Sequence, residues 1–468
     1  MVRSRSMTFL KKILTIDKRL SVDLLFLWSS QFLCAIIAFV TQLILVRLIS
    51  VSDYGVLSFS LTAISVISTI AGFGIGAFLL RVFGMEGWDA FRWIKPLNRI
   101  WMISVLVSIG IVFFFIYIEQ NRKIDNLLLL FISIIILQGI SNISFAVNQL
   151  EERFITFSIY KLLNQGYKFI IVLILYFIGA DLYKVGIGYS LGAFIVILLS
   201  IPAILKLFNK KIVLKGHVLS TDISELSKRK SKTMKETYNE LWPYAFAGIS
   251  YLIYNQSDVV ILGFFDSDYI VGIYSVAYTA LTVIYLFPST LYQSYLQPKI
   301  HRWIEKDPEK LFSLFLSGNK IMLVVSLSIM CIVFSFSKIL IPIVFGSKYL
   351  FSAEVLMVLS FAIPFRFLAI SFGSLLVTRN TMKRKFFYQL PGTAINIIIN
   401  LTCIPFIGIW GAVISTIVTE LVLFVLFLIG VNKYVLNGEG KFTKLVKPLL
   451  LPIVGTYSIL LSILYFVI

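Results

Sequence analysis

The stretch YLIYNQSDVVILGFFDSDYIVGIYSVA, residues 251–277, decides the fold class of this chain. It places Asn255 and Asp258 inside an apolar run, passes through a short acidic turn at Asp266 and Asp268, and then returns to apolar sequence. The apolar run is too long for a helix in a soluble core. A carboxylate inside such a run is costly to keep in hydrocarbon. We therefore expect a membrane protein in which the buried polar groups have a functional role.

The overall composition supports this expectation. The 468 residues are 59% hydrophobic and only 14% charged, which is typical of a membrane protein. A net charge of +19 would indicate a nucleic-acid partner in a soluble protein. Here the basic residues fall in short clusters between apolar stretches, so we interpret them as topology signals and expect no nucleic acid. With three cysteines in apolar stretches and only two histidines, we predict no disulfide, metal site or cofactor.

Thirteen segments meet the length requirement for a spanning helix, about 20 mostly apolar residues. The first follows a basic N-terminus and is longer than a signal-peptide core, so we expect it to be retained. Twelve segments are clear and the last is a further candidate, which predicts an all-α polytopic membrane protein with 12–14 transmembrane helices. The segments are 23–49, 54–80, 98–118, 126–149, 155–179, 182–207, 240–264, 269–297, 313–343, 351–378, 386–406, 409–432 and 446–467.

The domain organisation follows from the longest polar interval. We predict an N-terminal six-helix bundle over 1–208, a basic cytoplasmic linker over 209–239, a second six-helix bundle over 240–435 and an additional transmembrane helix over 436–468. Alternate loops are rich in Lys and Arg, which predicts a cytoplasmic N-terminus. The linker either lies against anionic lipid headgroups or docks a biosynthetic partner, and the sequence leaves both open.

Two short segments resemble each other. ISVSDYGVLSFSLTAI, residues 49–64, and FDSDYIVGIYSVAYTAL, residues 265–281, both have an acidic-aromatic turn followed by a glycine and a serine. Six helices return the chain to its starting side, so such halves would run parallel about an axis along the membrane normal. In transporters built from repeats, the substrate path lies between the halves.

Polar residues inside the apolar segments mark a candidate site. In 155–179, four of them have the spacing i, i+3, i+4, i+7 and therefore share one helical face. Similar faces occur in 126–149, 240–264 and 386–406, and two charges, Arg366 and Glu420, fall near the middle of their spans. The polar faces comprise Lys161, Asn164, Gln165 and Lys168; Gln138, Asn142 and Gln149; Tyr251, Asn255 and Asp258; and Gln389, Asn396 and Asn400.

Two interpretations of these groups stay open. Single Asn and Gln residues in bundles usually hydrogen-bond between helices, and Lys168 and Arg366 can form structural ion pairs with Glu420 or Asp258. Alternatively, all the groups line one polar cavity, since each unpaired ion near the bilayer centre costs at least about 2.5 kcal/mol. Such a cationic cavity, lined by amides, suits a phosphate-bearing head group with attached sugars.

Enzymatic functions find no support in the motifs. The sequence contains no P-loop, no G-x-S-x-G and no H-E-x-x-H. The predicted external loops are also too short for the catalytic domain of a membrane glycosyltransferase. We therefore expect a membrane transporter and not an enzyme.

Two stretches, 44–81 and 254–300, carry a resemblance to a known family. The chain resembles the Wzx-type polysaccharide flippases of the multidrug/oligosaccharidyl-lipid/polysaccharide (MOP) exporter superfamily, which also contains the MATE multidrug transporters and the lipid II flippases. The resemblance implies two six-helix bundles, related by a pseudo-twofold axis and forming a V around a central cavity. It also implies that a polyprenyl-pyrophosphate-linked oligosaccharide, such as an O-antigen or capsule repeat unit, crosses a bacterial cytoplasmic (inner) membrane.

The resemblance further implies coupling to an H⁺ or Na⁺ gradient, for which Asp258 and Glu420 are the available carboxylates. Besides the lipid-linked oligosaccharide, the expected partners are membrane lipids and other glycan assembly proteins. Two alternatives remain: a MATE-like multidrug or small-molecule cation antiporter, and a scaffold without transport activity. The position of the residues in this chain assigns substrate binding to Lys161, Lys168, Arg366, Asn142, Gln165, Asn255, Asn396 and Asn400.

Overall fold

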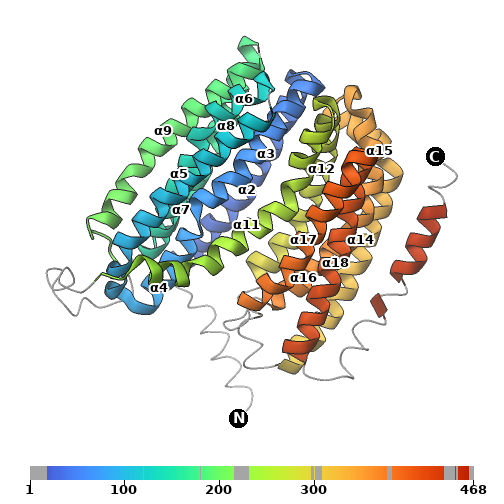
Figure 1. Cartoon of the computed structure of the whole chain (residues 1–468). Helices are drawn as coiled ribbons and strands as arrows, with labels where there is room; N and C mark the ends of the chain where they lie inside the picture. The colour runs from blue at the N-terminus through green and yellow to red at the C-terminus, as the bar shows by residue number, and fades with distance from the viewer. Residues whose placement is uncertain are drawn as a thin grey trace. The chain divides into compact units, whose positions relative to one another are not determined.

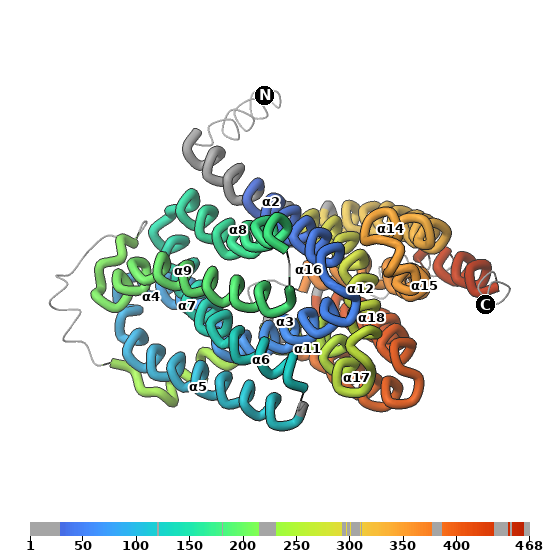
Figure 2. Tube along the Cα trace, turned by 90° about the horizontal axis from the view of Figure 1, so that it is seen from above, coloured from blue at the N-terminus to red at the C-terminus, as the bar shows by residue number. Residues whose placement is uncertain are grey.

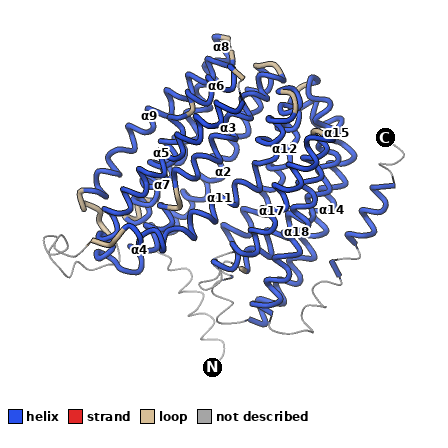
Figure 3. The backbone as a smooth tube through the Cα atoms, viewed as in Figure 1, coloured by secondary structure: helices blue, strands red, loops and turns tan. Residues whose placement is uncertain are grey.

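The computed structural model describes residues 18–119, 121–179, 181–214, 231–296, 300, 308–376, 382–436, 448–449 and 452–462. Every regular element in this part of the chain is helical, and no strand occurs in it (Figure 3). The predicted all-α fold class is therefore confirmed. The basic N-terminus before residue 18 and the linker residues 215–230 lie outside the described residues.

The helices of the first sequence half are separated by short turns (Figure 1). They are α2 (Lys18–Leu48), α3 (Val51–Gly72), α4 (Ile75–Glu86), the 3₁₀ segment η1 (Gly87–Trp93), α5 (Ile94–Glu119), α6 (Arg122–Leu130), α7 (Ile132–Leu150), α8 (Phe154–Ile178) and α9 (Leu182–Phe208).

The second half has the same helical character. Its elements are α11 (Met234–Phe265), α12 (Asp268–Ser289), a π-helical turn (Thr290–Leu296), α14 (Pro308–Phe345), η3 (Ser347–Tyr349), α15 (Leu350–Leu359), η4 (Ser360–Ala362), α16 (Ile363–Leu375), α17 (Met382–Ile407), α18 (Ile409–Val431) and a second π-helical turn (Asn432–Leu436).

Ten stretches of the described residues are long and apolar enough to cross a membrane. One of them, Val51–Ile118, contains both α3 and α5. The helix α11 is not among the ten because its polar run lowers its mean hydropathy. Within the described residues, each of the twelve clear spans predicted from the sequence lies mainly on helical structure. The thirteenth, 446–467, is only partly described, with a short apolar helix at Pro452–Ser462.

Several predicted spans are divided in the structure, among them 54–80 and 126–149. The segment 54–80 breaks between α3 and α4, where Phe73 and Gly74 have φ of 37° and 67°. Gly74 lies against the start of the membrane part of α11, since a Cβ at this position would be 2.7 Å from the amide nitrogen of Ala245. Glycine adopts this left-handed conformation without the steric cost of a side chain, so the break is encoded by a residue that hydropathy ignores.

The start of α11 is stabilised by a capping box. The hydroxyl of Thr233 accepts a hydrogen bond from the amide of Glu236 at 3.2 Å, and the carboxylate of Glu236 accepts one from the amide of Thr233 at 2.8 Å. This reciprocal pairing satisfies two of the free amides at a helix N-terminus. The same bonds hold the pKa of Glu236 at about 2, mainly through the backbone hydrogen bond from Thr233.

By their contacts the residues divide into two compact units. Unit 1 comprises 1–44, 67–118 and 126–246, and in it α7 packs against α4, α8 and α9. Unit 2 comprises 45–66, 119–125 and 247–468. In unit 2, α17 pairs with α18, α16 packs against α14 and α18, and α12 packs against α15 (Figure 2). The predicted division at 208, 239 and 435 stays a prediction.

Candidate functional site

Asp258 of α11 is the centre of a polar cluster inside unit 2. Its side chain is almost fully buried, with only 2% of its surface exposed. Oδ2 accepts hydrogen bonds from the hydroxyls of Thr416, at 2.7 Å, and Tyr274, at 3.0 Å. Oδ1 accepts bonds from the side-chain amides of Asn396, at 3.1 Å, and Asn400. The helices α11, α12, α17 and α18 thus all contribute a side chain to the cluster. Their hydrogen bonds to Asp258 offset the cost of burying its charge.

Helical spacing explains how this cluster forms. Asn396 and Asn400 are four residues apart on α17 and so lie on one face of the helix. The amide of Asn400 also donates to Oδ1 of Asn396 at 3.2 Å, whereas the side-chain oxygen of Asn400 is buried and has no hydrogen-bond partner among the described residues. The cluster therefore combines a carboxylate, two hydroxyls and an unsatisfied amide oxygen.

A second cluster in unit 2 surrounds Arg366 of α16. Its Nη1 lies 3.0 Å from Oε1 of Glu420, and only 8% and 5% of the two side chains are exposed. Nη1 also donates to the hydroxyl of Tyr254, and Nη2 donates to Oδ1 of Asn255 at 3.1 Å. The guanidinium lies over the rings of Tyr254 and Tyr285, at 5.4 and 5.3 Å from their centroids. Of the two acids that the sequence left open, the structure pairs Arg366 with Glu420.

The two clusters are neighbours along the same helices. Tyr254 and Asp258 are four residues apart on α11, and Thr416 and Glu420 are four residues apart on α18. One helical turn rises about 5.4 Å, so each of these helices contributes to both clusters on one face. The result is a continuous polar layer in unit 2, which includes every residue of the second half that the sequence assigned to substrate binding or coupling.

The predicted cations of unit 1 lie on α8 in different surroundings. Lys161 donates to the side-chain oxygen of Gln31 on α2 and lies 5.9 Å from the ring centroid of Phe157. Lys168 is half-buried, with its Nζ 6.0 Å from the ring centroid of Tyr167 and 5.8 Å from that of Tyr189. Neither lysine forms an ion pair within the described ranges.

The neutral polar residues predicted in unit 1 have different surroundings from the two lysines and from one another. Asn164 of α8 exchanges hydrogen bonds with Ser141 of α7, at 3.0 and 3.3 Å. Asn142 packs beside the α3–α4 break, where its side-chain nitrogen would be 2.5 Å from a Cβ on Gly72. Gln165 is half-buried on the lysine-bearing helix.

Comparison with known proteins places this geometry in a family. Residues 22–302, more than half of the chain, match the family described as polysaccharide biosynthesis protein. The chain belongs to the polysaccharide biosynthesis protein family. Among curated proteins no sequence match was found. The predicted resemblance is thus confirmed at the level of the family.

Solved structures of membrane transporters have similar folds, and one of them is a MATE family transporter of the MOP superfamily. The lipid II flippase MurJ in an inward closed conformation aligns with a TM-score of 0.65 and 14% identity, over 94% of this chain and 98% of that chain. The MATE multidrug transporter DinF-BH gives 0.58 and 13%, over 90% and 96%. An inward-facing MATE family transporter gives 0.55 and 12%, over 86% and 96%. The chain is a multi-pass membrane protein with this transporter fold.

The structure also adds residues that the sequence argument missed. Tyr274 and Thr416 contact Asp258, and Tyr254 contacts Arg366. A signal for two of them was present, because Tyr254 and Thr416 each lie four residues before a predicted charged residue on the same helix. The spacing alone did not single these residues out, because Tyr and Thr are common in apolar helices.

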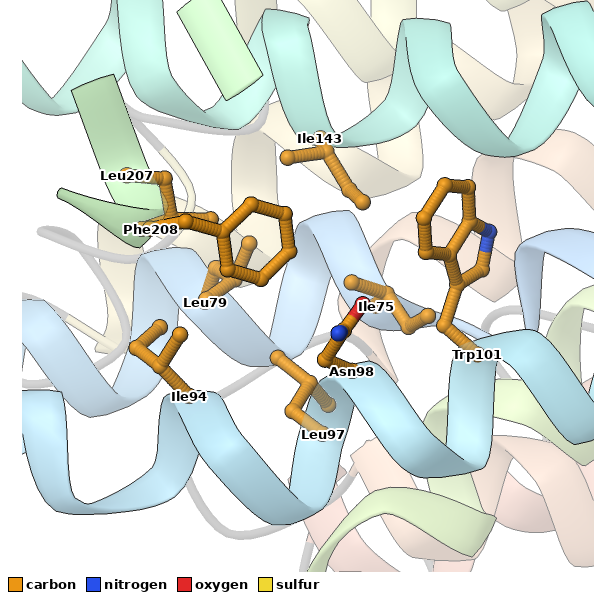
Figure 4. Close-up of a pocket in the computed structure, with 9 residues that line it drawn as sticks. All are labelled: Ile75, Leu79, Ile94, Leu97, Asn98, Trp101, Ile143, Leu207 and Phe208. Atoms are coloured by element: carbon orange, nitrogen blue, oxygen red, sulfur yellow. The ribbon is translucent and has the colours of Figure 1, made fainter. Parts of the chain in front are cut away.

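A pocket in unit 1 is lined by none of these polar residues (Figure 4). Its lining is apolar except for Asn98 and the indole nitrogen of Trp101. It contains no charged side chain and therefore offers nothing to hold an anionic head group. The lining residues are Ile75, Leu79, Ile94, Leu97, Asn98, Trp101, Ile143, Leu207 and Phe208.

Proposed function

We propose that the protein is a flippase for a polyprenyl-pyrophosphate-linked oligosaccharide, such as an O-antigen or capsule repeat unit. The observation that carries the proposal is the lysine face of α8 in a chain of the polysaccharide biosynthesis family. Two lysines without acidic partners among the described residues leave positive charge available for the pyrophosphate. The fold shared with a lipid II flippase supports a lipid-linked substrate.

In this proposal the two units have different tasks. Lys161 and Lys168 attract the pyrophosphate from the cytoplasmic side, and the amides of Asn142 and Gln165 hydrogen-bond the sugars. Arg366 contributes less to anion binding than either lysine, because Glu420 already neutralises it. In the second half, Asn255, Asn396 and Asn400 are proposed sugar contacts that require the existing bonds to Arg366 and Asp258 to rearrange.

The Asp258 cluster is the proposed coupling site. A carboxylate, two hydroxyls and the unpartnered oxygen of Asn400 are hard oxygen ligands of the kind that bind alkali and alkaline-earth cations. A proton on Asp258 would instead turn one of its accepting oxygens into a donor. Either event changes the hydrogen bonds that hold α11, α12, α17 and α18 together, and so would bias alternating access. Glu420, one turn away, would contribute through its pair with Arg366.

We further propose that the chain lies in the cytoplasmic membrane of a bacterial cell, with its N-terminus in the cytoplasm. The basic loops predicted from the sequence support this orientation. Impermeant thiol labelling of single cysteines placed in the turn at residues 121–122 and next to Thr233 tests it. Labelling from outside at the first position only supports the orientation, and the reverse result contradicts it.

Complementation tests the function. In cells that lack the protein, the wild type and Lys168→Arg should restore surface glycan, whereas Lys168→Ala should restore much less at equal protein level. The charge-retaining variant is the matched control, since it separates loss of the cation from loss of packing. If the wild type exports organic cations and leaves surface glycan unchanged, the multidrug antiporter is the correct function and the flippase proposal fails.

A further inference from the structure

The short helix Pro452–Ser462, called the C-terminal helix below, packs on unit 2 through one face. Ile453 and Leu460 are buried and Tyr457 is half-buried. These three residues have the spacing i, i+4, i+7 and therefore share one face of the helix. The large apolar residues on its other sides are more than half exposed; they are Val454, Ile459 and Leu461. The helix therefore docks along the face that carries Tyr457.

Tyr457 contacts the joint between α15 and α16. Its hydroxyl donates a hydrogen bond to the carbonyl of Phe361 in η4, the 3₁₀ turn that joins the two helices. The centroid of its ring lies 5.2 Å from that of Phe361 and 5.4 Å from that of Phe365, the third residue of α16. Tyr457 thus holds both sides of the joint, through one polar contact and two aromatic contacts.

The sequence of the joint explains why it needs an outside donor. The amide of Ile363 donates to the carbonyl of Ser360, in the 3₁₀ pattern. The next residue is Pro364, which has no N–H, so the pattern cannot continue to the carbonyl of Phe361. The Tyr457 hydroxyl donates to this carbonyl instead, from a position 96 residues later in the chain.

The joint sets the position of Arg366, which directly follows Phe365 in the first turn of α16. Its guanidinium lies 3.0 Å from Oε1 of Glu420, and hydrogen bonds weaken steeply as distance and angle depart from the optimum. Nε of Arg366 and Oε2 of Glu420 are buried and have no partner among the described residues. The pair is therefore not fixed at those atoms and depends on how the start of α16 is held.

A row of aromatic rings runs beside this ion pair. The ring of Phe365 lies 5.4 Å from that of Tyr457 and 6.3 Å from that of Phe424 on α18. Phe365 precedes Arg366, and Phe424 lies one helical turn after Glu420. The three rings thus connect the C-terminal helix to the same two helices that carry the charges. A displacement of Tyr457 would change the spacing between α16 and α18 at the level of the pair.

We propose that Tyr457 is a positioning residue for Arg366, which fixes the start of α16 so that the guanidinium faces Glu420. The proposal rests on the proposed function, in which this pair contributes to coupling. The described residues of the C-terminal helix include no charged side chain. The helix therefore acts on the charges of unit 2 through a hydroxyl and a ring, and it is more than a membrane anchor.

The reactivity of Glu420 tests the positioning without transport. Dicyclohexylcarbodiimide modifies protonated carboxyl groups in apolar surroundings, whereas a carboxylate paired with a guanidinium stays ionised and reacts slowly. Tyr457→Phe keeps the ring and removes only the hydroxyl. In the purified full-length protein it should raise the labelling rate of Glu420 about 5-fold, an effect of the size that one hydrogen bond supports. Mass spectrometry of the digested protein measures the label at each carboxyl group.

The matched control is Thr456→Val on the same helix. The hydroxyl of Thr456 donates to the carbonyl of Pro452 at 2.8 Å, within the C-terminal helix, so its loss should leave the labelling of Glu420 unchanged. Asp258, which does not contact Arg366, is the internal reference in the same digest. Unchanged labelling of Glu420 in Tyr457→Phe, or an equal rise at Asp258, would show that Tyr457 does not position Arg366 and would overturn the proposal.

Transport in proteoliposomes gives a second readout. In Tyr457→Phe the stimulation of transport by an imposed ion gradient should fall about 5-fold, whereas Thr456→Val should behave as the wild type. In the Arg366→Met/Glu420→Leu background, Tyr457→Phe should not change the stimulation that remains, because the pair is absent. Equal losses in both backgrounds would contradict the proposal. If the labelling changes as expected but the wild type moves no lipid-linked oligosaccharide, the proposed function fails and the positioning of Arg366 stands.

Discussion

The charges of unit 2 and the charges on α8 of unit 1 are buried in different ways. In unit 2, Arg366 is paired with Glu420 and Asp258 accepts four side-chain hydrogen bonds. On α8, Lys161 contacts the amide of Gln31 and the ring of Phe157, and Lys168 contacts the rings of Tyr167 and Tyr189. A charge with an internal partner contributes to structure or to switching. A charge with neutral partners keeps most of its attraction for an anion that arrives from outside the protein.

This difference also shows why a cationic residue inside a membrane span is not by itself evidence for substrate binding. Arg366 is as deeply placed in the membrane sequence as Lys168, and both were predicted to bind substrate. Removing a partner from a buried pair leaves an uncompensated ion, whereas removing an unpaired lysine removes a cost. Stability and transport should therefore respond oppositely in the two regions, and the following variants test that contrast.

The largest effect is expected for Arg366→Ala. It leaves Glu420 buried without its partner, which should destabilise the protein by about 3–5 kcal/mol. Thermal unfolding in detergent measures the loss. The double variant Arg366→Met/Glu420→Leu removes both charges and should recover most of the stability. A single variant as stable as the wild type would show that the pair is not buried in the protein as it exists.

The opposite pattern is expected for Lys168→Met. Its stability should equal or exceed that of the wild type, because no ion pair with a described residue is broken. Transport should fall by roughly 10- to 100-fold, the equivalent of about 1.5–3 kcal/mol for a hydrogen bond to a charged group. Flipping assays in proteoliposomes measure the rate, with Lys168→Arg as control. Lower stability together with unchanged transport would reverse the contrast between the two regions.

Asp258→Asn tests whether Asp258 couples transport to an ion gradient or only stabilises unit 2. The substitution keeps the shape and removes the charge, so unfolding should change little. The dependence of transport on the ion gradient should disappear, a loss of about 5- to 150-fold for a typical coupling free energy. Transport at imposed Na⁺ and H⁺ gradients measures it and identifies the ion. A variant that still responds fully to both gradients would remove Asp258 from the coupling mechanism.

The smallest effect is expected at an exposed pair. The pKa of Glu236 is about 2, well below its usual value, because of bonds to Thr233 and Lys232. A carboxyl group with a lowered folded pKa contributes stability above its unfolded pKa of about 4.3, and loses it as the pH falls toward 2. The wild type should therefore lose slightly more stability than Glu236→Gln over that interval in acid unfolding scans. Identical slopes would show that the capping box contributes nothing measurable.

Much of the fold was predictable because hydropathy and helical period are local properties. Apolar length identified the twelve clear spans, and spacing identified faces such as Asn396 with Asn400. The break at Phe73 and Gly74 was not predicted, because hydropathy carries no information about φ. The hydrogen-bond partners of Asp258 were not predicted because they are distant in sequence. Asn396 and Thr416 are 138 and 158 residues away in the chain.

The sequence by itself determined that this chain is an all-helical membrane protein, which polar residues share a helical face, and that the segments 49–64 and 265–281 resemble each other. Only the tertiary structure decided that Arg366 is paired with Glu420 while the α8 lysines have no acidic partner in the described ranges, and that Tyr457 bonds to the carbonyl of Phe361. The physical reason is that a helix face is set by neighbours three and four residues away. Its partners are set by how helices distant in the chain pack together.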